Sequence, residues 1–124
     1  MSKKNILLVI FISCNMVFAG ETGKMVGKVT DATTGDPLIG VNVVIKGTAL
    51  GAATDENGDF IILNIPAKTF IVSASYIGYK TTTMTDVRVN ADRTTTVNFS
   101  LEVSAVEGEE VIVEAERHVI VRDQ

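Results

Sequence analysis

Residues 27–65 read GKVTDATTGDPLIGVNVVIKGTALGAATDENGDFIILNI, and this stretch decides the fold. Its β-branched and apolar runs are short, and each ends at residues that favour turns, such as Gly35-Asp36-Pro37 and Asn57-Gly58. No sustained 3.6-residue period runs through it, so helix is not predicted. No candidate catalytic group stands among these residues. The stretch therefore predicts a small β-sandwich that binds or connects rather than an enzyme.

The same pattern continues on both sides and predicts seven short strands. A hairpin turn is expected at Asn57-Gly58, because this pair tolerates the positive φ angles of a tight reversal. Pro66 and Gly78 end their strands. Seven short strands at this spacing favour a sandwich over an open sheet. The expected strands are Met25–Thr30, Val41–Lys46, Leu50–Thr54, Phe60–Ile65, Thr69–Tyr76, Tyr79–Val89 and Thr94–Leu101.

Alternation along these strands predicts which side chains face inward. Each such side chain contributes about 1.5–3 kcal/mol when it is buried. Ten of them suffice for a domain of this size without a metal or a disulfide. The expected core is Val29, Val43, Ile45, Phe60, Ile62, Val72, Ala74, Val97, Phe99 and Leu101.

Two threonine runs, Thr81–Thr83 and Thr94–Thr96, allow two interpretations. Threonine combines β propensity with solubility, which suits the exposed face of an edge strand. The alternative is that the hydroxyl groups accept glycans. We expect the edge-strand role for both runs.

Residues 1–19 have the pattern of a secretory signal peptide. Lys3 and Lys4 precede the unbroken apolar run Ile6–Ile12, and small residues follow. Cleavage is expected between Ala19 and Gly20. The apolar run is too short to span a membrane, which takes about 20 residues. The alternatives are a buried N-terminal strand, or a lipoprotein box at Phe11-Ile12-Ser13-Cys14 with a lipid anchor on Cys14.

Loss of the signal peptide would change the composition. Cys14 is the one cysteine, so the mature chain would carry no disulfide and no thiol chemistry. Two lysines and no acidic residue would leave, which moves the net charge from −4 to −6. An acidic surface disfavours nucleic acid and anionic lipid as partners. The absence of Trp also gives poor support for a carbohydrate-stacking platform.

Candidate catalytic and metal sites are weak throughout the sequence. Asp55–Asp59 alternates acidic and amide groups as a calcium loop does, but Pro66 stands at the twelfth position, where a bidentate Glu is needed. His118 is the one histidine, so neither a zinc site nor a serine–histidine pair can be assembled. We therefore expect no enzyme, no cofactor and no metal.

The motifs GKVTD, GDPLIGVNVVIKGT and GAATDENGDF, within residues 27–60, resemble the carboxypeptidase-regulatory-like domain. Tyr76–Lys80 is similar to the "GY" segment of that family, and Val97–Leu101 to its closing strand. The match covers about residues 24–102. The resemblance implies a transthyretin-like (prealbumin-like) Greek-key β-sandwich, of the kind found at the N-terminus of TonB-dependent outer-membrane receptors.

The C-terminal tail carries a second resemblance. Residues 103–110 are polar and acidic and are predicted to be a linker. The following Glu110-Val111-Ile112-Val113-Glu114-Ala115 is similar to the Ton box of TonB-dependent receptors, with Glu114 in place of the usual Thr. The resemblance implies that a TonB-type periplasmic protein binds this extended, unpaired segment by strand addition. The alternatives are an eighth strand of the sandwich or a linker into a further domain.

These observations predict a signal peptide over residues 1–19, a β-sandwich over 20–102, and an acidic linker with a Ton box over 103–124. The expected function is that of a non-catalytic accessory domain on the periplasmic side of the outer membrane. If the chain is the exported leading piece of a receptor, a plug and a barrel follow it in cis. The alternative is a stand-alone secreted or periplasmic module that binds protein or glycan.

Overall fold

A computed structural model of the chain describes residues 21–106 and 108–115. The predicted leader 1–19, the cleavage point Ala19–Gly20 and His118 lie outside the described residues. Among the residues that are described, no helix is long and apolar enough to cross a membrane.

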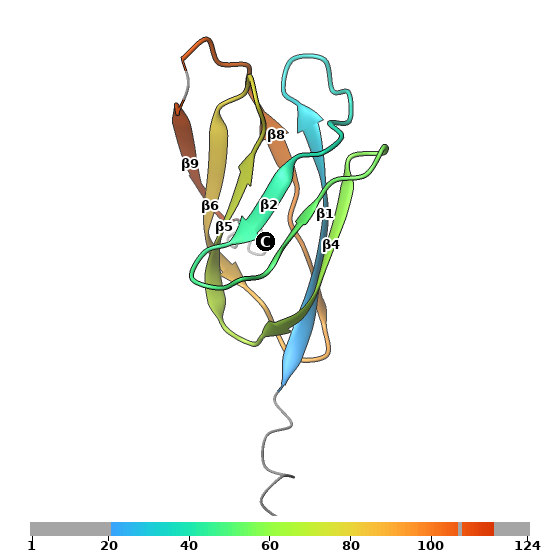
Figure 1. Ribbon diagram of the computed structural model, residues 1–124. Coiled ribbons are helices and arrows are strands. Elements are labelled where there is room, and N and C mark those ends of the chain that lie inside the picture. The colour runs from blue at the N-terminus through green and yellow to red at the C-terminus, as the bar shows by residue number, and fades with distance from the viewer. Residues whose placement is uncertain (1–20, 107, 116–124) are drawn as a thin grey trace, which may run out of the picture.

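Two β-sheets pack face to face, which confirms the predicted all-β sandwich (Figure 1). One sheet has the order β4-β1-β7, with β8 also paired to β1, and the other has the order β3-β2-β5-β6-β9. The strands of the first sheet are β1 (Thr22–Asp31), β4 (Asp59–Pro66), β7 (Thr94–Thr96) and β8 (Phe99–Leu101). Those of the second are β2 (Asn42–Ile45), β3 (Gly51–Ala53), β5 (Thr69–Ser75), β6 (Thr81–Arg88) and β9 (Glu110–Glu114).

All seven predicted strands are present, but the described residues form nine. The predicted strand Thr94–Leu101 is two strands, because β1 pairs first with β7 and then with β8. Between them the Asn98 side chain takes the place of a backbone partner: its Oδ1 accepts the Lys28 N–H at 3.0 Å. The other added strand is β9, in a region predicted to be a linker followed by an unpaired tail.

The turn at Asn57-Gly58 is present, but it is not a hairpin. Gly58 has a φ of 79°, and the Asp55 carboxylate accepts the N–H groups of Asn57 and Asp59, both at 2.9 Å. The strands on either side belong to different sheets, since β3 pairs with β2 whereas β4 pairs with β1. The turn therefore carries the chain from one sheet to the other. It also engages Asp55 Oδ1 in backbone hydrogen bonds, as a plain turn does.

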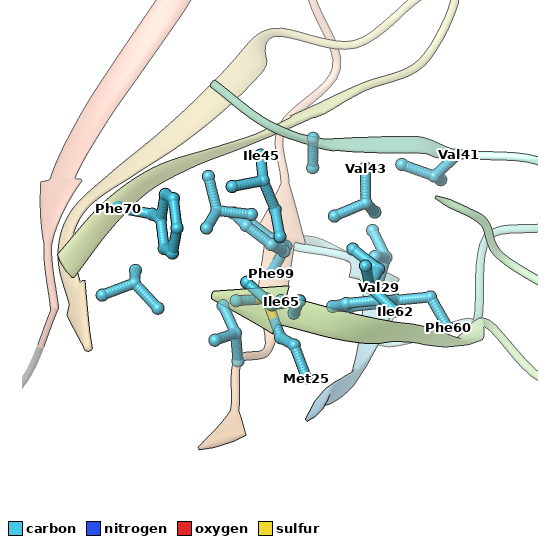
Figure 2. Close-up of a cluster of buried hydrophobic side chains, with 14 of the residues drawn as sticks. Met25, Val29, Val41, Val43, Ile45, Phe60, Ile62, Ile65, Phe70 and Phe99 are labelled. Atoms are coloured by element: carbon cyan, nitrogen blue, oxygen red, sulfur yellow. The ribbon is translucent and has the colours of Figure 1, made fainter. Parts of the chain in front are cut away.

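The core lies between the sheets, and it includes all ten residues expected from the alternation. Figure 2 shows its side chains projecting into this layer from both sides. Met25 and Val29 come from β1, Ile62 from β4, and Ile45 from β2. Phe60 and Phe99 pack with their ring centroids 6.5 Å apart. The remaining members of the core are Val41, Ile65, Phe70, Val87 and Val89.

The two threonine runs differ in exposure. Thr94 and Thr96 are exposed, as expected for the surface of a short strand. Thr82 and Thr83 are instead buried, at 6% and 5% exposure. The edge-strand prediction is wrong for this run, because β6 is not an edge: β5 lies on one side of it and β9 on the other.

Candidate functional site

The predicted Ton box forms strand β9 at one edge of the five-stranded sheet (Figure 1). It pairs in parallel with β6, and Thr81 faces Glu110 while Thr85 faces Glu114. The expectation of an unpaired segment is therefore wrong in this structure. The physical reason is that Val111-Ile112-Val113 has high β propensity and lies within reach of the open side of β6.

The two faces of β9 have different surroundings. Val111 and Val113 line a groove of about 310 Å³ together with Met84 and Phe99, so they point toward the seam between the two sheets. Ala115, just beyond the strand, packs against the core. Ile112 faces outward and is 66% exposed. The strand thus covers an opening on its inner side and presents an apolar side chain on its outer side.

Hydrogen bonds fix both ends of β9. At its start, the Thr81 N–H donates to the Glu109 carbonyl at 2.9 Å, and the Thr83 hydroxyl lies 2.6 Å from Glu110 Oε2. At its end, the Ala115 N–H donates to the Thr85 carbonyl at 2.8 Å. These contacts define the register of the parallel pair.

Thr83 connects β9 to the interior of its sheet. Its hydroxyl lies 2.6 Å from the Glu110 carboxylate and 3.3 Å from Ser73 Oγ. Because a hydroxyl has a single proton, donation to the carboxylate leaves Ser73 to donate to Thr83. A hydrogen bond to a charged acceptor is stronger than one to a neutral acceptor. The Glu110 carboxylate therefore determines that Thr83 donates to it and that Ser73 donates to Thr83.

The connection before β9 is attached to the sandwich and is not a free leash. The Lys80 N–H donates to the Glu102 carbonyl at 2.7 Å, and the Ser104 N–H donates to the Gly78 carbonyl at 2.9 Å. Lys80 Nζ also lies 3.1 Å from Glu102 and 3.7 Å from Glu109. The hydrogen bond with Glu102 and the nearby charge of Glu109 raise the pKa of Lys80. The connection therefore follows residues 78–80 along the surface.

A partly buried Asp–Tyr pair, which no sequence motif indicated, fixes the end of the sandwich beside this connection. The Tyr79 hydroxyl donates to Asp31 Oδ2 at 2.6 Å, and Asp31 Oδ1 accepts the N–H groups of Thr33 and Thr34. The hydrogen bond from Tyr79 lowers the pKa of Asp31, and the backbone donors lower it further. The same bond raises the pKa of Tyr79. The pair ties the "GY" segment to the end of β1.

An open cavity of about 710 Å³ lies at the same end of the molecule. Tyr76 and Tyr79 line it, with ring centroids 5.6 Å apart. Ile77 projects from its rim and is 87% exposed. Over the described residues, no three His, Cys, Asp or Glu side chains come close enough to hold a metal ion.

Residues 25–113 match the family model described as the CarboxypepD_reg-like domain. The chain belongs to this family. The matched region begins inside β1 and ends inside β9, so the family pattern of a CarboxypepD_reg-like domain takes in most of the candidate segment. The resemblance found in the sequence motifs is thereby confirmed.

This CarboxypepD_reg-like domain is similar to parts of TonB-dependent receptors. It is 29% identical over 110 residues to TonB-dependent receptor P3 of Formosa agariphila. The aligned region covers 89% of the chain and 10% of the receptor. The domain is 49% identical over 49 residues to TonB-dependent receptor SusC of Bacteroides thetaiotaomicron, or 39% of the chain and 5% of the receptor. The chain thus spans about a tenth or less of the receptors it matches.

Solved structures agree on the fold. A chain of a type II cohesin–X–dockerin complex from Acetivibrio cellulolyticus superposes with a TM-score of 0.53 at 26% identity, over 62% of this chain and 52% of that one. The minor pilin of Streptococcus agalactiae gives a TM-score of 0.51 at 18% identity, over 70% and 47%. Both similarities support an immunoglobulin-like or prealbumin-like β-sandwich.

Proposed function

We propose that this chain is the N-terminal accessory domain of a TonB-dependent outer-membrane receptor, and that it presents residues 110–115 to a TonB-type periplasmic protein. The domain performs no catalysis itself. It lies on the periplasmic side of the outer membrane, and the receptor's plug and barrel are its partners in cis. The similarity to two receptors, from two different bacteria, supports this context.

One observation carries the proposal: the candidate segment is an extended strand at the end of a sheet. β9 closes the order β3-β2-β5-β6-β9, so β6 borders it on one side only. Extended segments at sheet edges are the substrates of strand addition, in which backbone hydrogen bonds give affinity and alternate side chains give specificity. The segment therefore has the conformation that a strand-adding partner requires.

The test is the binding of the chain to a purified C-terminal domain of TonB, measured by calorimetry. Ile112→Asp should weaken binding at least tenfold, because it places a charge in the centre of the presented segment. Ile61→Asp is the matched control, since Ile61 is also an exposed isoleucine on a strand, at 51% exposure, but on β4 in the other sheet. Equal affinities for the two variants, or no binding by the unaltered chain, would refute the proposal.

A second candidate function is that of a stand-alone module that binds a protein partner. The cavity at the Tyr79 end and the exposed Ile77 favour it. The tyrosine rings pack against each other and Tyr79 uses its hydroxyl on Asp31, so they do not form an open platform for glycan stacking. Loss of partner capture by Ile77→Asp, with Ile112→Asp unaffected, would favour this function over the first.

A further inference from the structure

Strand β9 buries little apolar surface against the sandwich, although backbone hydrogen bonds pair it with β6. Of its five residues only Val111 is half-buried, while Ile112 and Val113 are 66% and 40% exposed. Segments with few buried apolar contacts open locally at low free energy, well before the whole domain unfolds. We therefore expect β9 to leave β6 more readily than β5 leaves its neighbours, since Val72 and Ala74 of β5 are fully buried.

The chain before β9 has attachments of its own. Glu102 and Ser104 form backbone hydrogen bonds with residues 78–80, and Lys80 pairs with Glu102 and Glu109. These bonds do not involve β9 itself. When β9 opens, the connection can remain in place, so the released strand stays near β6 and can dock again.

Docking on β6 turns one of the two alternating sets of side chains, Val111 and Val113, toward the seam between the two sheets. Val111 and Val113 point into the groove beside Met84 and Phe99. A partner that adds a strand recognises every second side chain in its own pockets. A partner whose pockets take Val111 and Val113 cannot reach them while β9 lies on β6, although Ile112 remains exposed.

We propose that β9 is a self-docking latch: the sandwich holds the TonB-binding segment on β6, and a partner must displace β6 to take it. The inference rests on the proposed function, because it assigns a regulatory state to the same segment. In this latch the partner takes the edge of β9 that β6 occupies in the docked state, and not the open outer edge, so the sandwich sets how readily the segment is available.

The size of the effect follows from the fraction of chains in which β9 is released. A partner that binds only the released state has an apparent affinity lowered by that fraction. If about one chain in ten to one in a hundred is released at any time, binding is weakened about 10- to 100-fold. Any change that loosens β9 should recover part of this factor.

A disulfide between register partners tests the latch directly. Thr83 and Ile112 are partners in the parallel pair, and neighbouring strands lie about 4.8 Å apart, within disulfide range. The double variant Thr83→Cys/Ile112→Cys, made in a Cys14→Ser background, can be compared with itself, oxidised and reduced. Binding of the purified TonB C-terminal domain should be at least tenfold weaker in the oxidised form. Equal or tighter binding when oxidised would mean that the partner uses the outer edge of docked β9, which would overturn the latch.

A second lock guards against an effect of the Ile112 substitution itself. Thr85→Cys/Glu114→Cys joins another pair of register partners at the far end of the strand. The same loss on oxidation is expected. If neither lock responds to oxidation although the unaltered chain binds, the latch is wrong.

Hydrogen exchange separates failure of the latch from failure of the proposed function. If no form of the chain binds TonB, the proposed function fails, and the latch is judged by exchange alone. Amides 111 and 113, which face β6, should then exchange faster than amides 72–74 of β5, and oxidation of either lock should slow them. Exchange as slow as that of β5 in the unlocked chain would overturn the latch.

A variant that weakens the docking of β9 should strengthen TonB binding, whereas the disulfide locks should weaken it. Thr83→Val removes the hydroxyl that donates to Glu110 and keeps the shape of the side chain. It should speed exchange of amides 111 and 113 and strengthen TonB binding several-fold. Thr96→Val is the control, because Thr96 is an exposed threonine on β7 of the other sheet. Weaker TonB binding by Thr83→Val than by the control would contradict the latch.

Discussion

The backbone of Gly27 lies very close to the backbone of Val97, so Gly27→Ala should destabilise the sandwich severely. It is in β1, between β4 and the point where β7 gives way to β8. A Cβ added there would lie 1.7 Å from the Val97 carbonyl oxygen and 2.7 Å from the Phe60 ring. Both of these residues are buried, at 4% exposure. Glycine is required because two backbones approach each other closely, not because of its φ angle.

The cost can be worked from these contacts. The Val97 backbone must move by more than an ångström, and its N–H donates to the Val26 carbonyl at 2.9 Å. Overpacking costs about 1–3 kcal/mol, and a lost hydrogen bond adds about 1 kcal/mol. We therefore expect Gly27→Ala to lower the free energy of unfolding by about 2–4 kcal/mol, a large part of the about 5–15 kcal/mol typical of a domain.

Urea unfolding followed by circular dichroism measures this loss. Gly35→Ala is the control: Gly35 has a positive φ of 79° but nothing within 4 Å of the added Cβ. It should lose only the backbone cost of about 1–2 kcal/mol. A loss of 1 kcal/mol or less for Gly27→Ala would refute the close approach of β1 to the β7–β8 crossing.

Three further predictions concern the core, the acid response and the connection before β9. Leu101→Ala, at a fully buried position, should cost about 2–5 kcal/mol in urea unfolding, while Ile77→Ala, 87% exposed, should change little. The pKa of Asp31 is below its ordinary 3.8. The ionised carboxylate therefore stabilises the folded state above pH 3.8, and this stabilisation disappears as pH falls through the lowered pKa. Tyr79→Phe should reduce stability at neutral pH, and the difference from the unaltered chain should shrink as Asp31 is protonated below pH 3.8; a difference that grows there would contradict the pair. Lys80→Gln should speed hydrogen exchange of the Ser104 amide without affecting β2; unchanged exchange would mean that the Lys80 ion pairs do not hold the connection.

Alternation and turn residues predicted the body of the fold because they act locally. Val43 and Ile45 alternate with exposed or half-buried neighbours, so their burial could be predicted. Val41 and Val89 continue the same alternation and are fully buried, but the expected core did not include them. Like Met25 and Ile65, each stands at the first or last position of a predicted strand, where sequence patterns are least certain.

Pairing partners were harder to predict than strands. Asn57-Gly58 has the sequence of a hairpin turn, but its flanking strands pair with β1 and β2 in different sheets. A turn sequence fixes the local reversal, and long-range packing decides which strands become neighbours. The split between β7 and β8 depends likewise on the Asn98 side chain meeting the Lys28 amide, 70 positions away in the sequence.

The candidate segment was identified from sequence as an unpaired tail, and its pairing in the sandwich agrees with the alternative of a further strand. Glu110–Ala115 was identified from its resemblance to a Ton box, and its extended conformation followed from Val111-Ile112-Val113. Docking on β6 depends on an open strand edge contributed by residues 81–85, far from the segment in sequence. The one available signal was Thr81–Thr83 itself, since a threonine run typical of an edge strand marks a place where another strand can pair.

The most direct test of the account is a titration of the isotopically labelled chain with the C-terminal domain of TonB, followed by amide chemical shifts. We predict shifts at residues 110–115, where the partner binds, together with shifts at residues 81–85 of β6, which lose their neighbour. The amide chemical shifts of β1 should not change. Shifts confined to other surfaces, or no shift at residues 110–115 at saturating TonB, would contradict it.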